Sequence, residues 1–89
     1  MPQVAVPPPY RGPTGGIQRI DVEGSSVEDC LRAVGERFPG FAEQIFDDQG
    51  CVHRFVNLFV NGEEIDRQDL GHTVADGDTV EILAAIAGG

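Results

Sequence analysis

The carboxyl-terminal stretch of this 89-residue chain constrains its fold and its chemistry more than any other segment. Residues 79–84 place Val80 and Ile82 on one side, as expected of a strand with one buried face. They lead directly into residues 85–89, a run of small residues around one isoleucine that ends in two glycines. Such a run has few side chains to anchor it, and a glycine backbone passes through openings that any Cβ would block. We therefore expect a domain over residues 1–84 and a flexible tail over residues 85–89, with Gly89 as the reactive end.

The first part of the chain predicts a hairpin with a long connection. Residues 3–6 and 18–22 alternate apolar and polar side chains, which is typical of half-buried strands. Three prolines stop the first of these segments, because proline cannot donate to a strand ladder. The intervening residues 10–16 are rich in glycine and proline and are expected to form the connection.

A helix is expected next. Ser25 and Glu28 have the spacing of a capping box, which predicts that the helix begins there. Pro39-Gly40 is expected to end it. A short helical turn over residues 41–46 then tucks two apolar side chains under the domain. The predicted buried stripe of the main helix has helical spacing and consists of Val27, Cys30, Leu31, Val34 and Phe38.

The second half of the chain predicts the remaining strands. Residues 52–60 form the longest strand candidate, Asn61-Gly62 is a strong turn signal, and residues 63–65 can pair back. The order is strand, strand, helix, strand, short strand, strand. It predicts an α+β domain of the β-grasp (ubiquitin-like) type, in which a mixed sheet of four to five strands packs on one main helix.

Composition excludes several classes of function. The formal net charge of −9 disfavours nucleic acid and anionic membranes as partners, because phosphate binding needs clustered lysine and arginine. No apolar run is long enough to span a bilayer, and the amino terminus lacks a signal-peptide pattern, so a cytoplasmic location is expected.

The chain also lacks the residue constellations of an enzyme or a metal site. Cys30 falls on the buried stripe, and Cys51, His53 and His72 lack metal-ligand spacing. Two cysteines are too few for an iron–sulfur ferredoxin, and there is no nucleophile–base arrangement. We therefore expect no catalytic residue, no metal and no enzymatic activity of its own.

Five segments resemble the ubiquitin-like sulfur carriers of the ThiS/MoaD family, over essentially the whole chain. They are residues 11–16, ending Thr14-Gly15-Gly16; His53-Arg54-Phe55-Val56-Asn57; Val60-Asn61; Asp76-Gly77-Asp78-Thr79-Val80; and Ala85-Ile86-Ala87-Gly88-Gly89. Within the family, the chain looks most similar to CysO-type carriers of thiocarboxylate-dependent cysteine biosynthesis.

The resemblance implies a carrier chemistry centred on Gly89. An E1-like adenylating enzyme would use ATP to activate the Gly89 carboxylate, and sulfur would then displace AMP to leave a thiocarboxylate. Ala87, Gly88 and Gly89 would be the tail presented to partners, and the chain itself would bind no cofactor. The sulfur would pass to a biosynthetic enzyme, with a cysteine synthase-like enzyme favoured and thiamin or molybdopterin synthesis left open.

Strand parity suggests where partners dock. Phe55, Phe59 and Leu83 point away from the buried face and are expected to form an exposed apolar patch near the base of the tail. The alternative is that the short helix or the amino-terminal segment covers the two phenylalanines.

Two other functions fit the same features. The chain resembles a ubiquitin-like protein modifier equally well, conjugated to lysines through Gly89. A non-catalytic β-grasp binding module, with an accidental Gly-Gly end, is the third reading.

Overall fold

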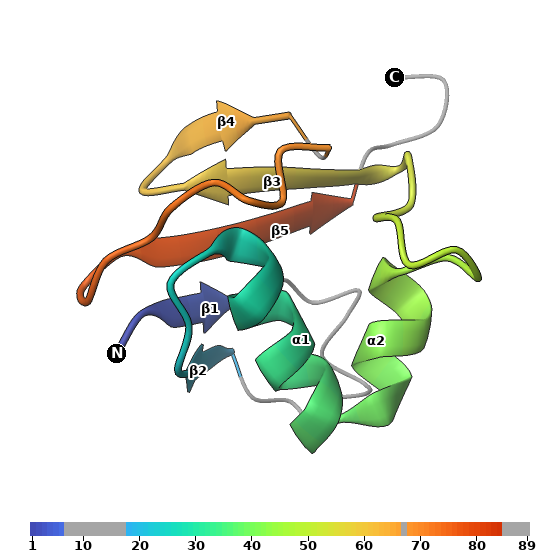
Figure 1. The fold of residues 1–89 in the computed structure, drawn as a ribbon, viewed down its shortest axis with the longest axis horizontal. Coiled ribbons are helices and arrows are strands. Elements are labelled where there is room, and N and C mark those ends of the chain that lie inside the picture. The colour runs from blue at the N-terminus through green and yellow to red at the C-terminus, as the bar shows by residue number, and fades with distance from the viewer. Residues whose placement is uncertain (7–17, 67, 85–89) are drawn as a thin grey trace.

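The computed structural model describes residues 1–6, 18–66 and 68–84, with Ala84 described by its backbone alone. These residues form one mixed sheet with two helices on one of its faces (Figure 1). The elements are, in chain order, β1 (Gln3–Ala5), β2 (Arg19–Asp21), α1 (Val27–Arg37), α2 (Pro39–Ile45), β3 (Val56–Val60), β4 (Glu63–Ile65) and β5 (Thr79–Ala84).

The sheet has five strands in the order β2-β1-β5-β3-β4. The first and last strands, β1 and β5, are parallel neighbours at its centre, and the other strand pairs are antiparallel. This is the β-grasp arrangement predicted from the order of the elements. The long connection of the first hairpin and the tail over residues 85–89 lie outside the described residues.

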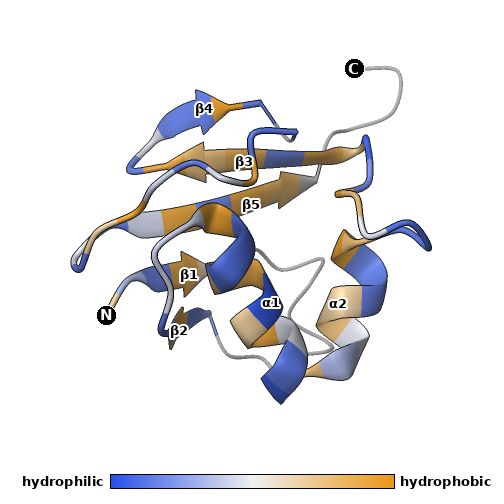
Figure 2. Cartoon of the chain, viewed as in Figure 1, coloured by the Kyte–Doolittle hydropathy of each residue, from blue (hydrophilic) through white to orange (hydrophobic). Residues whose placement is uncertain are grey.

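Strand alternation builds the core. In β3 and β5, Val56, Leu58, Val80 and Ile82 are buried against the helices, and these two strands carry much of the hydrophobic sequence (Figure 2). The predicted stripe of α1 is confirmed from Val27 to Val34, and Phe38 packs against the core while partly exposed. From α2, Phe41 and Ile45 are completely buried.

The two helices pack closely at one glycine. Gly35 of α1 is buried, and a Cβ added there would lie 2.8 Å from the Cβ of Ala42 in α2. Real Cβ atoms do not approach so closely, so the absence of a side chain at Gly35 allows the close approach of the two helices.

The predicted start of the helix was wrong by one residue. Ser26, not Ser25, is the N-cap, and its Oγ accepts a hydrogen bond from the backbone N–H of Asp29 at 3.1 Å. The Asp29 carboxylate accepts in return from the backbone N–H of Ser25 at 3.2 Å. The reason is a contact distant in sequence: a β-bridge between Ser26 and Thr73 holds the chain extended up to the cap.

Two further boundaries differ from the prediction. Pro39 follows the end of α1 and is also the first residue of α2. Proline lacks a backbone N–H, and at the first helical position that group would have no intrahelical partner, so nothing is lost. The predicted strand over residues 52–60 is regular only from Val56. Val52 instead forms an isolated bridge with Phe46, and a turn between the backbone N–H of Val56 and the carbonyl of His53 separates the two parts.

Candidate docking surface

The face of the sheet opposite the helices, called here the outer face, carries two of the predicted partner-binding residues, Phe59 and Leu83. Because Leu58 and Ile82 point into the core, their neighbours Phe59 and Leu83 point to the outer face. Among the described residues, both helices lie on the other side of the sheet (Figure 1). The strand parity predicted from the sequence is therefore correct for Phe59 and Leu83, whereas Phe55 lies in the turn before β3 and is not part of the strand.

Phe55 and Leu83 are the exposed members of the predicted patch. Phe55 is 48% exposed and Leu83 is 43% exposed, and both lie near the end of β5 from which the tail continues. Leu83 pairs with Asn57 across the β3–β5 ladder, two residues from Phe55. The ring of His53 stacks on Phe55, with centroids 4.9 Å apart and planes inclined by 12°, which fixes that side chain beside the patch.

Phe59 is only partly exposed. It is the next-to-last residue of β3, where its cross-strand partners are Glu81 of β5 and Glu64 of β4. Cross-strand partners have Cβ atoms about 4.5–5.5 Å apart, so both acidic side chains flank the ring on the outer face. The patch is thus an apolar strip with carboxylates beside it.

The two glutamates were not predicted as site residues, although the sequence contains the signal. The two-residue turn at Asn61-Gly62 fixes the hairpin register, because both residues adopt positive φ (52° and 86°) as a tight hairpin turn requires. That register pairs Val60 with Glu63 and hence Phe59 with Glu64. Counting outward from the turn would have identified Glu64.

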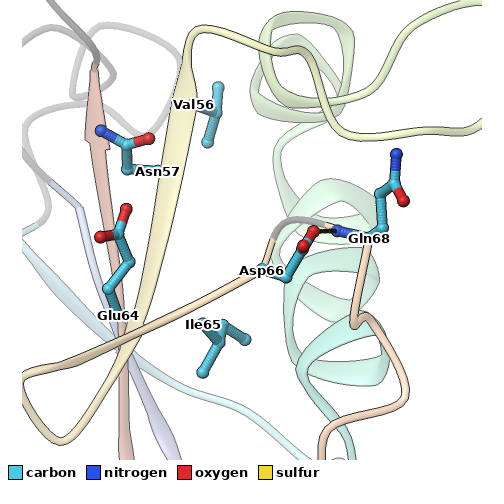
Figure 3. A pocket seen from close by; sticks show the side chains of 6 residues that line it. All are labelled: Val56, Asn57, Glu64, Ile65, Asp66 and Gln68. Carbon is cyan, nitrogen blue, oxygen red and sulfur yellow. Dashed lines mark hydrogen bonds between the residues drawn. The ribbon is translucent and has the colours of Figure 1, made fainter.

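A shallow pocket adjoins this strip where β4 ends (Figure 3). Its volume is about 490 Å³, and Asn57 and Glu64 belong both to its lining and to the outer face. Asp66 adds a second carboxylate, whose Oδ1 accepts a hydrogen bond from the backbone N–H of Gln68 at 2.8 Å. A wall with two carboxylates and two side-chain amides, Asn57 and Gln68, suits a cationic or hydrogen-bond-donating side chain of a partner.

The predicted tail residues Ala87, Gly88 and Gly89 lie outside the described residues. The structure fixes only the point from which the tail continues: Ala84 pairs with Val56 at the end of the β3–β5 ladder. Leu83 and Phe55 therefore lie at the end of the sheet where the tail begins, and Phe59 lies farther along β3.

The cysteines and histidines do not form a site in the described part of the chain. Cys30 is buried, and burial followed by the nearby Asp29 carboxylate raises the pKa of its thiol, which keeps it protonated. Cys51 is exposed, and His72 instead contacts Asp69 at 3.2 Å. No group of three or more potential metal ligands occurs among residues 1–6, 18–66 and 68–84. Within the same ranges, neither helix has the length and hydrophobicity needed to cross a membrane.

Comparisons with known proteins place this fold in a family. The model of the ThiS family matches residues 12–89. Sulfur carrier protein CysO of Mycobacterium tuberculosis is 35% identical over 89 residues, which cover 97% of this chain and 96% of that protein. Small archaeal modifier protein 1 of Haloferax volcanii is 32% identical over 72 residues, which cover 80% of this chain and 79% of that protein.

A solved structure agrees with the sequence relatives. The crystal structure of the Amycolatopsis orientalis BexX/CysO complex contains a chain that superimposes with a TM-score of 0.86 at 33% identity, with full coverage of both chains. Both the sequence and the fold therefore show that this chain belongs to the ThiS family and is a homologue of sulfur carrier proteins.

Proposed function

We propose that this chain is a sulfur carrier and that the Gly89 carboxylate receives the sulfur. The observation that carries the proposal is the similarity to the sulfur carrier CysO, which covers 97% of the chain, together with a family match that continues through residue 89. The chain acts as substrate and carrier, and the catalytic groups belong to its partners.

The proposed chemistry begins with activation of Gly89. A carboxylate reacts poorly with nucleophiles because its oxygen is a poor leaving group. An E1-like enzyme joins the carboxylate to the AMP portion of ATP and releases pyrophosphate. Hydrosulfide then attacks the carbonyl carbon, the bond from carbon to the AMP oxygen breaks, and a thiocarboxylate remains. Since the reaction consumes ATP, the cytoplasm is the compartment we propose.

The patch of Phe55, Phe59 and Leu83 is the surface we assign to docking. Its two most exposed side chains are large and apolar, and Glu64 and Glu81 flank its third member. The complementary surface on the activating enzyme is apolar with basic side chains at its edge, since opposite charges favour encounter and register. The solved complex of a related CysO with BexX supports docking to a protein partner.

The same relatives support a proposal for the acceptor of the sulfur. We assign a cysteine synthase-like enzyme, because the similarity is to CysO-type carriers. The thiocarboxylate sulfur is a nucleophile, so the acceptor must present an electrophilic carbon in a site that admits the narrow tail. Thiamin and molybdopterin synthesis are the other acceptor chemistries for a carrier of this family.

The test measures the pyrophosphate that the cognate E1-like enzyme releases when it activates the chain. Deleting Gly89, or adding one alanine after it, moves the carboxylate by about 3.5 Å along an extended chain. Even about 1 Å of misplacement costs on the order of 10²-fold in an aligned reaction, so both variants should lose activation. Gly88→Ala should also lose it, because a Cβ obstructs a narrow channel.

Gly71→Ala is the matched control. Position 71 is exposed, and a Cβ built there has no atom within 4 Å, so this alanine adds no contact. It should be activated like the parent protein. Undiminished turnover by the Gly89 deletion would show that Gly89 is not the reactive end, and would favour a non-catalytic binding module.

A protein modifier is the second candidate function. The similarity to small archaeal modifier protein 1 over 80% of this chain favours it. In that case the activated Gly89 forms an amide with a lysine of another protein. Species heavier than the carrier, present in cell extracts with the parent chain and absent with the Gly89 deletion, would support this role.

A further inference from the structure

All six basic side chains of this protein are arginines; the sequence contains no lysine. They are spread over the length of the chain at Arg11, Arg19, Arg32, Arg37, Arg54 and Arg67. The absence of lysine matters for a chain whose own carboxyl terminus becomes an activated acyl group, as we propose for Gly89.

An activated acyl group reacts with free amines as well as with sulfur. An amine nitrogen attacks the carbonyl carbon, a C–N bond forms, the bond to the leaving group breaks, and the amine loses a proton to solvent. A lysine with an ordinary pKa of about 10.4 always supplies a small fraction of free amine at neutral pH. The arginine guanidinium stays protonated because its pKa exceeds about 12, and it offers no lone pair.

The remaining amine is the α-amino group of Met1, and the topology places it at the wrong end of the sheet. Because β1 and β5 are parallel and Gln3 pairs with Thr79, Met1 lies beyond the start of β5, where its nitrogen is 3.5 Å from Asp76. At about 3.3 Å per residue, Ala84 is about 17 Å from the start of β5, and Met1 lies two residues farther on.

The tail cannot bridge that distance. Its five residues, 85–89, span at most about 18 Å when fully extended. The path from Ala84 to Met1 is about 23 Å by the same rise per residue.

We propose that this carrier does not capture its own activated Gly89, because no amine of the same molecule comes within reach of it. Within one molecule, no amine therefore competes with the sulfur nucleophile for the acyl group. The inference rests on the proposed activation of Gly89. The exposed thiol of Cys51 does not alter it, because attack by a thiol gives a thioester that is still activated.

The test uses a thioester at Gly89 made by intein fusion, so that no activating enzyme is needed. Arg54→Lys places an amine at the base of the tail, because position 54 lies two residues before Val56, the partner of Ala84. Arg37→Lys, in the last turn of α1, is the matched control away from the end of β5 (Figure 1). Intact mass is followed at mildly alkaline pH, with Cys51→Ser in every protein.

The parent should hydrolyse without forming an internal amide, and any amide to Met1 of a second molecule should form at a rate that rises with protein concentration. Arg54→Lys should form an internal amide, lighter than the acid by one water, at least about tenfold faster than any amide forms in the parent, because a tethered amine acts at an effective concentration in the millimolar range. Arg37→Lys should likewise form no internal amide, and its amide-linked dimers should form at a rate that rises with protein concentration. Amide products in the parent at the rate of Arg54→Lys would overturn the inference, as would hydrolysis alone in Arg54→Lys.

The result is independent of the proposed function. If the cognate enzyme failed to adenylate Gly89, the intein-derived thioester would still report on capture by the chain's own amines. Conversely, amide formation by the parent would leave the pyrophosphate assay unaffected.

Discussion

Substituting the buried glycine of α1 tests the packing of the two helices. In Gly35→Ala, the new methyl group lies 2.8 Å from the Cβ of Ala42. The Ala42 methyl cannot rotate away, because its position is set by a helix whose Phe41 and Ile45 are fully buried. The helices must therefore separate, and overpacking of this kind costs about 1–3 kcal/mol.

A favourable term opposes this cost. Alanine is better than glycine in a helix by about 0.5–1 kcal/mol. The net expectation for Gly35→Ala is therefore a loss of about 0.5–2 kcal/mol in the free energy of unfolding, measured by urea denaturation with an unchanged m-value. For a domain of this size each kcal/mol corresponds to a fall of about 4–8 °C in Tm.

The reciprocal variant provides the control. Ala42→Gly removes the methyl group that the new one would meet, so the double variant Gly35→Ala/Ala42→Gly should lose less stability than the sum of the two single losses. If Gly35→Ala were as stable as the parent or more stable, helix propensity would dominate and the close approach of the helices would not matter.

Three further predictions concern stability. Leu58→Ala should cost about 2–5 kcal/mol in urea denaturation because Leu58 is fully buried, whereas the partly exposed Phe59→Ala should cost less and instead weaken docking to the activating enzyme. Ser26→Ala should cost about 0.5–2 kcal/mol and Ser25→Ala less, since Ser26 caps α1; equal losses would contradict the assignment. Hydrogen bonds from the Ala75 N–H and then Asn61 lower the pKa of Asp78, so the unfolded chain takes up a proton first as pH falls. The stabilisation is therefore present above the ordinary aspartate pKa of about 3.9 and lost as pH falls through the lower folded value. Asp78→Asn should flatten this acid limb of the stability curve.

Much of the fold was predictable because its signals are local. Period-two alternation identified the buried faces of β1, β3 and β5, and Asn61-Gly62 identified the β3–β4 hairpin. Those features depend on neighbouring residues alone. The predicted end of β5 at Ala84 also agrees with the structure.

The errors lie where contacts distant in sequence decide. The N-cap is Ser26 and not the predicted Ser25, because Ser26 forms a β-bridge with Thr73, which is distant in sequence. The strand predicted to begin at residue 52 begins only at Val56, because Val52 pairs with Phe46 outside the sheet. Proline at position 39 marks both a helix end and a helix start, and the sequence alone does not distinguish the two.

The docking surface was predicted in part. Parity gave the direction of Phe59 and Leu83, but Phe55 lies in a turn outside β3, and the degree of exposure depends on neighbouring strands. Phe59 is partly exposed because strands flank it on both sides, whereas Phe55 precedes β3 and stays open. The assignment of these residues to partner binding remains a prediction.

The intact mass of the protein isolated from its native cells tests the central claim most directly. Fragmentation locates any mass change within the chain. A sulfur carrier should show a fraction of molecules in which one oxygen is replaced by sulfur, with the change confined to the peptide ending in Gly89. Protein that is uniformly unmodified at Gly89 while the cells are actively synthesising sulfur metabolites, or that carries its sulfur elsewhere, would contradict the account.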